Sequence, residues 1–154
     1  MSGRSVEHAT FVVERKYDAS PERAFAAWAD PEAKARWFVG PDAHLELDFR
    51  VGGRERHQGT APDGSPYSYE ALYQDIVPGQ RIVYTYDMLL QETRISVSLA
   101  TVEFTPVGDN GSRLVFTEQG AFLDGHESPA GRAEGIGSLL DALEKELQGD
   151  TPGA

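Results

Sequence analysis

The chain of 154 residues contains no cysteine. Disulfide bonds, a catalytic thiol and thiolate metal ligands are therefore excluded. The first residues lack the apolar core of a secretory signal peptide, and no apolar run approaches the ~18 residues that a membrane-spanning helix needs. Because a chain without disulfides suits the reducing cytosol, we expect a cytoplasmic protein without a membrane as partner.

Basic residues are scarce. Lys and Arg number 14 against 25 Asp and Glu, which gives a formal net charge of -11. Nucleic acids and anionic membranes attract clustered Lys and Arg, and the sequence shows no such cluster. We therefore expect no nucleic acid among the partners.

Motifs for nucleotide-driven or hydrolytic chemistry are also missing. The sequence has no Gly-x-Ser-x-Gly nucleophile motif, no P-loop and no glycine fingerprint for dinucleotides. His44, Glu46 and Asp48 lie on one face of a predicted strand and have side chains that bind metals, but the opposite face is apolar. A solvated face is the simpler interpretation, so we expect no cofactor and no metal.

Helix signals follow the first predicted strand, at residues 10–17. Ser20 is a good N-cap and Pro21 suits the first helical position, so a helix is predicted to begin at residue 21. Asp30 and Pro31 are predicted to end this helix and to begin another toward Trp37. Two short helices thus follow the first strand.

Turn signals separate the remaining strands. Gly52-Gly53, Pro78-Gly79 and the run 108–111 are typical of turns. Alternating or β-prone segments between the turns predict strands at 45–49, 53–60, 67–76, 81–88, 94–105 and 112–120. Hairpin-like connections between seven strands favour an antiparallel sheet. No repeat or linker divides the chain, so we expect one domain over 1–154, with a core at about 10–148 and flexible ends.

The last predicted element is a helix from Pro129 to about Gln148, with Ser128 as its N-cap. Its apolar stripe consists of Ala133, Ile136, Leu140, Leu143 and Leu147. Glycines at 131, 135 and 137 each cost about 0.5–1 kcal/mol relative to alanine inside a helix. Two explanations remain open, namely close packing of the helix on the sheet and room for a ligand.

The order of several motifs resembles a known family. They are the Ser-Pro-Glu-x-x-Phe-x-x-Trp segment at 20–28, Trp37-Phe38 before Gly40-Pro41, Gly52-Gly53-Arg54, the run 75–85, Gly111-Ser112-Arg113-Leu114 and the leucines of the last helix. Over roughly residues 10–148 the chain resembles the activator-of-Hsp90-ATPase-like branch of the START-like superfamily, which includes polyketide cyclases and plant pollen allergens. The resemblance implies an α+β helix-grip fold, in which a curved antiparallel sheet surrounds a long C-terminal helix and a cavity lies between them.

Aromatic and polar residues on the predicted strands indicate what lines such a cavity. Glu118 shares the inward face of its strand with Leu114 and Phe116, so its carboxylate must be paired or protonated unless the strand end is solvated. Arg54 is a further polar candidate, whereas Glu55 stands where related proteins often have an aromatic residue. An ordinary aromatic core is the alternative interpretation. The predicted ligand-binding residues are Trp37, Phe38, His57, Tyr69, Tyr84, Tyr86, Phe116, Glu118, Phe122, Ile136 and Leu140.

The predicted strand at 94–105 gives two conflicting faces. Ile95, Val97 and Leu99 form one apolar face, and Ala100, Val102 and Phe104 form the other. Either a β-bulge near 99–100 switches the faces, or the first half covers a subunit interface, as in a homodimer. The inward face of this strand stays open at the level of sequence.

Three function classes follow. The leading one is the binding of a small, largely hydrophobic or aromatic ligand between sheet and helix. The first alternative is a cyclase-like or hydrolase-like enzyme with His57, Glu118 or a tyrosine as acid or base, for which a strongly shifted pKa in a cleft would argue. The second is a co-chaperone of the Hsp90 type, which rests on the resemblance alone.

Overall fold

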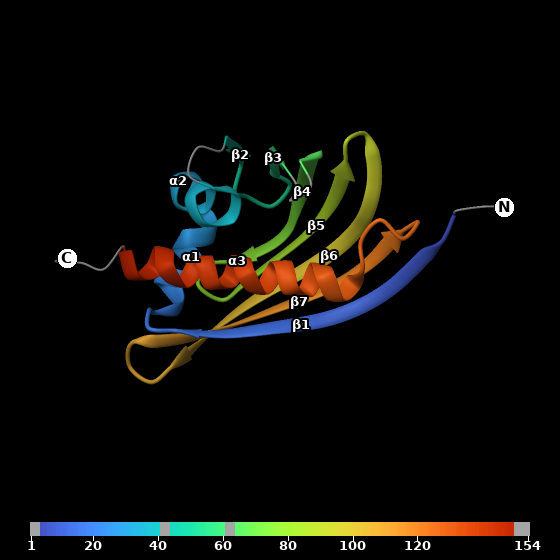
Figure 1. Ribbon diagram of the computed structural model, residues 1–154. Helices are drawn as coiled ribbons and strands as arrows, with labels where there is room; N and C mark the ends of the chain where they lie inside the picture. Colours follow the sequence, from blue (N-terminus) through green and yellow to red (C-terminus); the bar gives the residue numbers. More distant parts are fainter. Residues whose placement is uncertain (1–3, 41–43, 61–63, 150–154) are drawn as a thin grey trace.

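A single curved antiparallel sheet wraps around the C-terminal helix in the computed structural model (Figure 1), which describes residues 4–40, 44–60 and 64–149. The strands are β1 (Val6–Tyr17), β2 (Leu45–Leu47), β3 (Arg54–Thr60), β4 (Pro66–Val77), β5 (Arg81–Leu90), β6 (Thr93–Val107) and β7 (Gly111–Leu123). Their order across the sheet is β1-β7-β6-β5-β4-β3-β2. The predicted α+β helix-grip fold is confirmed.

The helices are α1 (Pro21–Ala29), α2 (Pro31–Lys34), the π-helical turn η1 (Ala35–Val39) and α3 (Pro129–Gly149). Ser20 and Asp30 cap the first two as predicted, because Ser20 Oγ accepts from Arg23 N at 3.1 Å and Asp30 Oδ2 accepts from Ala33 N at 3.2 Å. The sequence did not predict the π-turn. It brings Trp37 into the core and leaves the neighbouring Phe38 beside α3.

The core lies between the concave face of the sheet and the helices. Trp28 and Trp37 meet edge to face with ring centroids 4.9 Å apart, and Trp37 Nε1 donates to Ala27 O at 2.9 Å. Helix α3 is fixed to β1 where Tyr17 Oη donates to Leu140 O at 2.9 Å. The predicted stripe of α3 is buried at Ile136, Leu140, Leu143 and Leu147, whereas Ala133 is only partly buried and Arg132, which was not predicted, is buried.

The structure shows which face of strand β6 points inward. The even-numbered residues from Ser96 to Phe104 face inward, and Val97 is 43% exposed on the outer face. A register shift opposite Met88 and Leu89 marks a bulge at Ile95, so a bulge exists but four residues before the predicted place. The pattern was ambiguous because the inward positions at 96 and 98 carry serines. A homodimer through the outer face stays a prediction.

No helix within the described segments is both long enough and apolar enough to cross a lipid bilayer.

Candidate functional site

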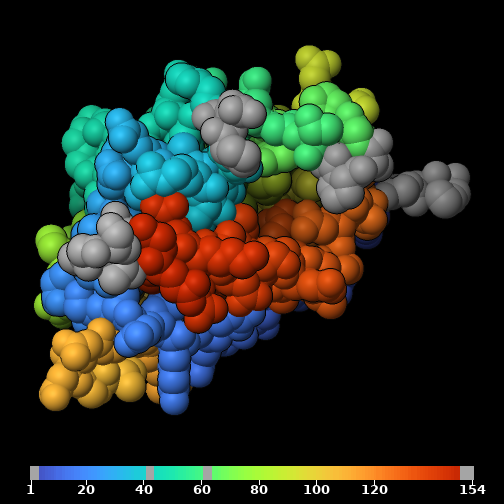
Figure 2. Space-filling view, turned by 60° about the vertical axis from the view of Figure 1, so that its left-hand side comes forward, coloured from blue at the N-terminus to red at the C-terminus, as the bar shows by residue number. Residues whose placement is uncertain are grey.

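A cavity of about 240 Å³ lies between α3 and the strands β3, β4 and β5. Figure 2 shows the surface hollowed between α3, in red and orange, and the green strands. The volume is below the roughly 300–1,000 Å³ of sites for drug-sized ligands, so it suits a smaller molecule. The lining residues are Phe38, His57, Tyr67, Tyr69, Tyr84, Tyr86, Met88, Glu127, Arg132, Gly135, Ile136 and Leu139.

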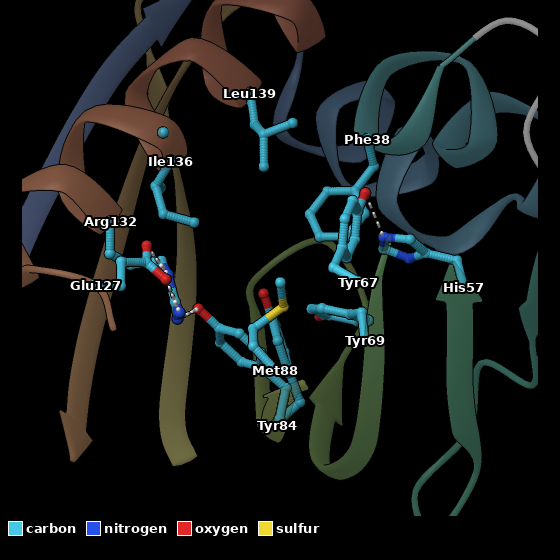
Figure 3. A pocket seen from close by; sticks show the side chains of 12 residues that line it. Phe38, His57, Tyr67, Tyr69, Tyr84, Met88, Glu127, Arg132, Ile136 and Leu139 are labelled. Carbon is cyan, nitrogen blue, oxygen red and sulfur yellow. Dashed lines mark hydrogen bonds and ion pairs between the residues drawn. The ribbon is translucent and has the colours of Figure 1, made fainter. Parts of the chain in front are cut away.

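Aromatic side chains form the floor and one wall (Figure 3). They come from alternate positions of neighbouring strands, and the register places His57 opposite Tyr69. The His57 and Tyr69 rings stack with centroids 4.7 Å apart, and Tyr69 stacks on Tyr86 at 5.0 Å. Phe38 closes this wall by meeting both His57 and Tyr69 edge to face. Ile136 and Leu139 of α3 cover the rings from the opposite side.

Tyr67 occupies its place because Gly59 lies opposite it on β3. A Cβ atom at Gly59 would come within 2.6 Å of Tyr67 Oη, so any side chain there would displace the ring. In the observed position Tyr67 Oη lies 3.4 Å from His57 Nε2. The pair forms one polar end of an otherwise aromatic cavity.

His57 is electrically neutral at pH 7. Burial lowers the pKa of its imidazole to about 4, against a weaker opposing effect of the Glu55 carboxylate. His57 Nδ1 is buried and has no hydrogen-bond partner. Burial also raises the pKa of the Tyr67 phenol, and it raises those of Tyr69 and Tyr84 well above their ordinary value. This end of the cavity therefore offers uncharged hydrogen-bonding groups.

Arg132 forms the other polar end. Its guanidinium donates to Glu127 through Nε at 2.7 Å and through Nη2 at 2.6 Å. Nη2 also donates to Ser96 Oγ at 2.8 Å, and Nη1 donates to Tyr86 Oη at 2.9 Å and to Glu118 Oε2 at 3.3 Å. These contacts occupy a side chain that is almost wholly buried.

Glu118 faces inward, as predicted, and is fully buried. Ser98 Oγ and Tyr86 Oη donate to its carboxylate at 2.7–2.8 Å, in addition to Arg132. Burial raises the pKa of Glu118, and the hydrogen bonds from Ser98 and Tyr86 oppose that rise. The alternative of a solvated strand end is wrong. Glu118 lies behind Tyr86 and supports the cavity without lining it.

A second buried ion pair lies next to the cavity. Lys34 Nζ is 2.6 Å from Glu55 Oε1, and both side chains are 0% exposed. Tyr73 Oη also donates to Glu55 Oε1, and the ammonium lies 4.5 Å from the centre of the Phe38 ring. Burial lowers the pKa of Lys34, whereas the Glu55 charge raises it. Sequence reasoning missed this pair, although Glu55 has the inward parity of His57 on β3.

The structure brings together six of the predicted ligand-binding residues, namely Phe38, His57, Tyr69, Tyr84, Tyr86 and Ile136. Trp37, Phe116 and Leu140 lie in the core, and Phe122 packs against the Arg132 guanidinium. The suggestion that Arg54 serves the cavity is wrong, because its position on β3 faces outward. Met88, Glu127, Arg132 and Leu139 were missed, and Tyr67 was not among the predicted ligand-binding residues either. Arg132 precedes Ile136 of the helical stripe by one turn, and that spacing was the available signal.

Room for a ligand explains one glycine of α3, and close packing explains another. Gly135 lines the cavity, and a Cβ atom there would meet nothing within 4 Å. A Cβ at Gly137 would come within 3.0 Å of Arg15 Nη2, so close packing explains that position. Among the described residues, no group of three His, Asp or Glu side chains gathers in a way that would hold a metal ion, and this includes His44, Glu46 and Asp48.

Comparisons with known proteins agree with the fold. The family model described as activator of Hsp90 ATPase homolog 1-like protein matches residues 18–148. A protein of Rhizobium leguminosarum is 46% identical with a TM-score of 0.90, over 96% of this chain and 99% of that one. The Mll3558 protein of Rhizobium loti is 49% identical with a TM-score of 0.85, over 92% and 99%.

A more distant solved structure shows the fold alone. The protein SA2116 of Staphylococcus aureus, described as of unknown function, is 20% identical with a TM-score of 0.72, over 94% of this chain and 96% of that one. None of the curated proteins compared with the chain matches it.

Proposed function

We propose, given that the chain belongs to the activator of Hsp90 ATPase homolog 1-like family, that it binds a small hydrophobic or aromatic ligand between α3 and the sheet. One observation carries this proposal. A cavity of about 240 Å³ is walled by stacked aromatic rings and covered by Ile136 and Leu139. Transfer of an apolar ligand into such a cavity is favourable at roughly 25 cal/mol per Å² of apolar surface removed from water.

The polar groups of the cavity support binding more than turnover. Among the described lining residues His57 is the one histidine, and no carboxylate or carbonyl of the described part of the chain accepts from its Nδ1 to orient the ring. Burial suffices to explain its low pKa, and the Tyr67 phenol beside it is a weaker acid than usual, so it is no activated nucleophile. Glu118 is held by three side chains and does not line the cavity. The groups present can orient a ligand by hydrogen bonds.

Calorimetric titration with 2-naphthol tests the proposal. We expect binding of one molecule per chain, with a dissociation constant below about 1 mM. Gly135→Phe places a ring in the cavity and should abolish binding. Ser138→Phe is the matched control, because it adds the same ring at an exposed position of the same helix outside the lining. Absence of binding to the wild type, or equal binding to both variants, would contradict the proposal.

A further inference from the structure

Among the described residues that line the cavity, Arg132 has the one cationic side chain, and all its N–H groups donate hydrogen bonds within the protein. A guanidinium has five N–H donors. Nε and one Nη2 hydrogen are directed at the two oxygens of Glu127, and the other three reach Ser96, Tyr86 and Glu118. An incoming anion therefore finds no free donor on Arg132 while Glu127 is in place.

Glu127 is the least fixed member of this network. It belongs to the short connection between β7 and α3, and its side chain is 28% exposed, whereas that of Glu118 is fully buried. The two-point contact with Arg132 is the geometry in which a guanidinium binds a free carboxylate. Glu127 thus occupies the position that a ligand carboxylate would take.

The charges around the cavity do not favour an anion. The charges of Arg132 and Glu127 cancel, and Glu118 adds one negative charge when it is ionised and none when it is protonated. Lys34 and Glu55 form an ion pair, so their charges also cancel. The charges around the cavity sum to zero or -1, and the chain as a whole, with these residues included, has a formal charge of -11 that repels anions at longer range. A bound anion would lose its hydration without gaining a counter-charge.

The free polar groups are of a different kind. Tyr67 and His57 at the other end offer a phenol and a neutral imidazole. Neutral donors form hydrogen bonds of about half the strength of charged ones, so they suit a hydroxyl, carbonyl or amide better than a carboxylate.

We propose that Glu127 is a specificity-determining residue, which closes the Arg132 site to ligand carboxylates and thereby restricts the cavity to uncharged aromatic ligands. This inference rests on the proposed function. The polar group of the ligand then lies at the Tyr67–His57 end, and its apolar part lies between the tyrosine rings and Ile136.

The test compares 2-naphthamide with 2-naphthoate at pH 7, because the two probes share their shape and differ in charge. We expect the wild type to bind the amide at least roughly tenfold more tightly than the carboxylate. Glu127→Ala frees two donors of Arg132 and should strengthen naphthoate binding by at least roughly tenfold, with little change for the amide. Glu134→Ala removes the same charge from an exposed position of α3 and should behave as the wild type.

Glu127→Gln, which keeps the shape of the side chain, should shift the preference in the same direction and guards against a folding defect of the alanine variant. Equal affinity of the wild type for both probes, or an unchanged preference in both Glu127 variants, would overturn the inference and leave the proposed function standing. Failure of the wild type to bind either probe would overturn both.

Discussion

At the scale of single residues, His57 is a buried imidazole that stays neutral. Its ring stacks on Tyr69, and burial lowers its pKa to about 4. The sequence alone could have shown that His57 and Glu55 lie on the same face of β3, because they are two positions apart on one strand. The neutral state of the His57 imidazole could not be predicted in this way, because it depends on burial by Phe38 and Tyr69, which come from other elements.

His57 should make the protein less stable in acid. Its pKa is about 6.5 in the unfolded chain and about 4 in the folded one, so between these values the unfolded chain binds a proton that the folded chain does not. The free energy of unfolding should fall as the pH decreases from about 6.5 to about 4, by on the order of 3 kcal/mol.

Urea unfolding of the wild type and of His57→Gln at pH 7 and pH 4 measures this contribution, because the variant lacks the titrating group and keeps the others. An equal loss of stability in both proteins between the two pH values would contradict the low pKa of His57.

Lys34 and Glu55 are a buried pair whose single loss should be costly. Removal of one partner leaves the other charge unpaired in the core, which typically costs about 3–5 kcal/mol. We expect losses of that size for Lys34→Met and for Glu55→Leu. The double variant should recover most of the stability, because two apolar side chains need no partner.

Denaturant unfolding of the three variants completes a double-mutant cycle. Losses that simply add in the double variant would show that the two side chains do not depend on each other, against the contact of 2.6 Å.

At the scale of elements, the sequence indicated nearly all helices and strands but was less informative about faces. The caps Ser20 and Asp30 and the glycine turns depend on neighbours in the chain, so local patterns predicted them. The inward face of β6 was hidden because two of its positions carry serines, Ser96 and Ser98, which form hydrogen bonds with Arg132 and Glu118. No local pattern in the sequence indicated the π-turn at Ala35–Val39.

Helix α3 should gain stability from alanine at one of its glycines. Gly135→Ala meets no atom within 4 Å and restores helix propensity, so the free energy of unfolding should rise by about 0.5–1 kcal/mol. Gly137→Ala should gain less, because its methyl group would come within 3.0 Å of Arg15 Nη2. Urea unfolding compares the two variants, and a larger gain at Gly137 would contradict the packing described for α3.

At the scale of the whole molecule, the order of motifs predicted the family and the fold, and both are confirmed. The site was predicted in part. Most aromatic residues of the cavity walls alternate along strands and were predicted, whereas Arg132 and Glu127 come from one charged segment whose role becomes visible only when α3 is placed on the sheet. A co-chaperone role and a homodimer stay predictions.

We propose that the ligand binds in the cavity between α3 and the sheet. Titration of the isotope-labelled protein with 2-naphthol, followed by amide chemical shifts in two-dimensional NMR spectra, tests it most directly. We expect saturable shifts centred on His57, Tyr67 and Gly135. Shifts confined to the outer face of the sheet, around Val97 and Gln119, or no saturable shift at all, would contradict the account.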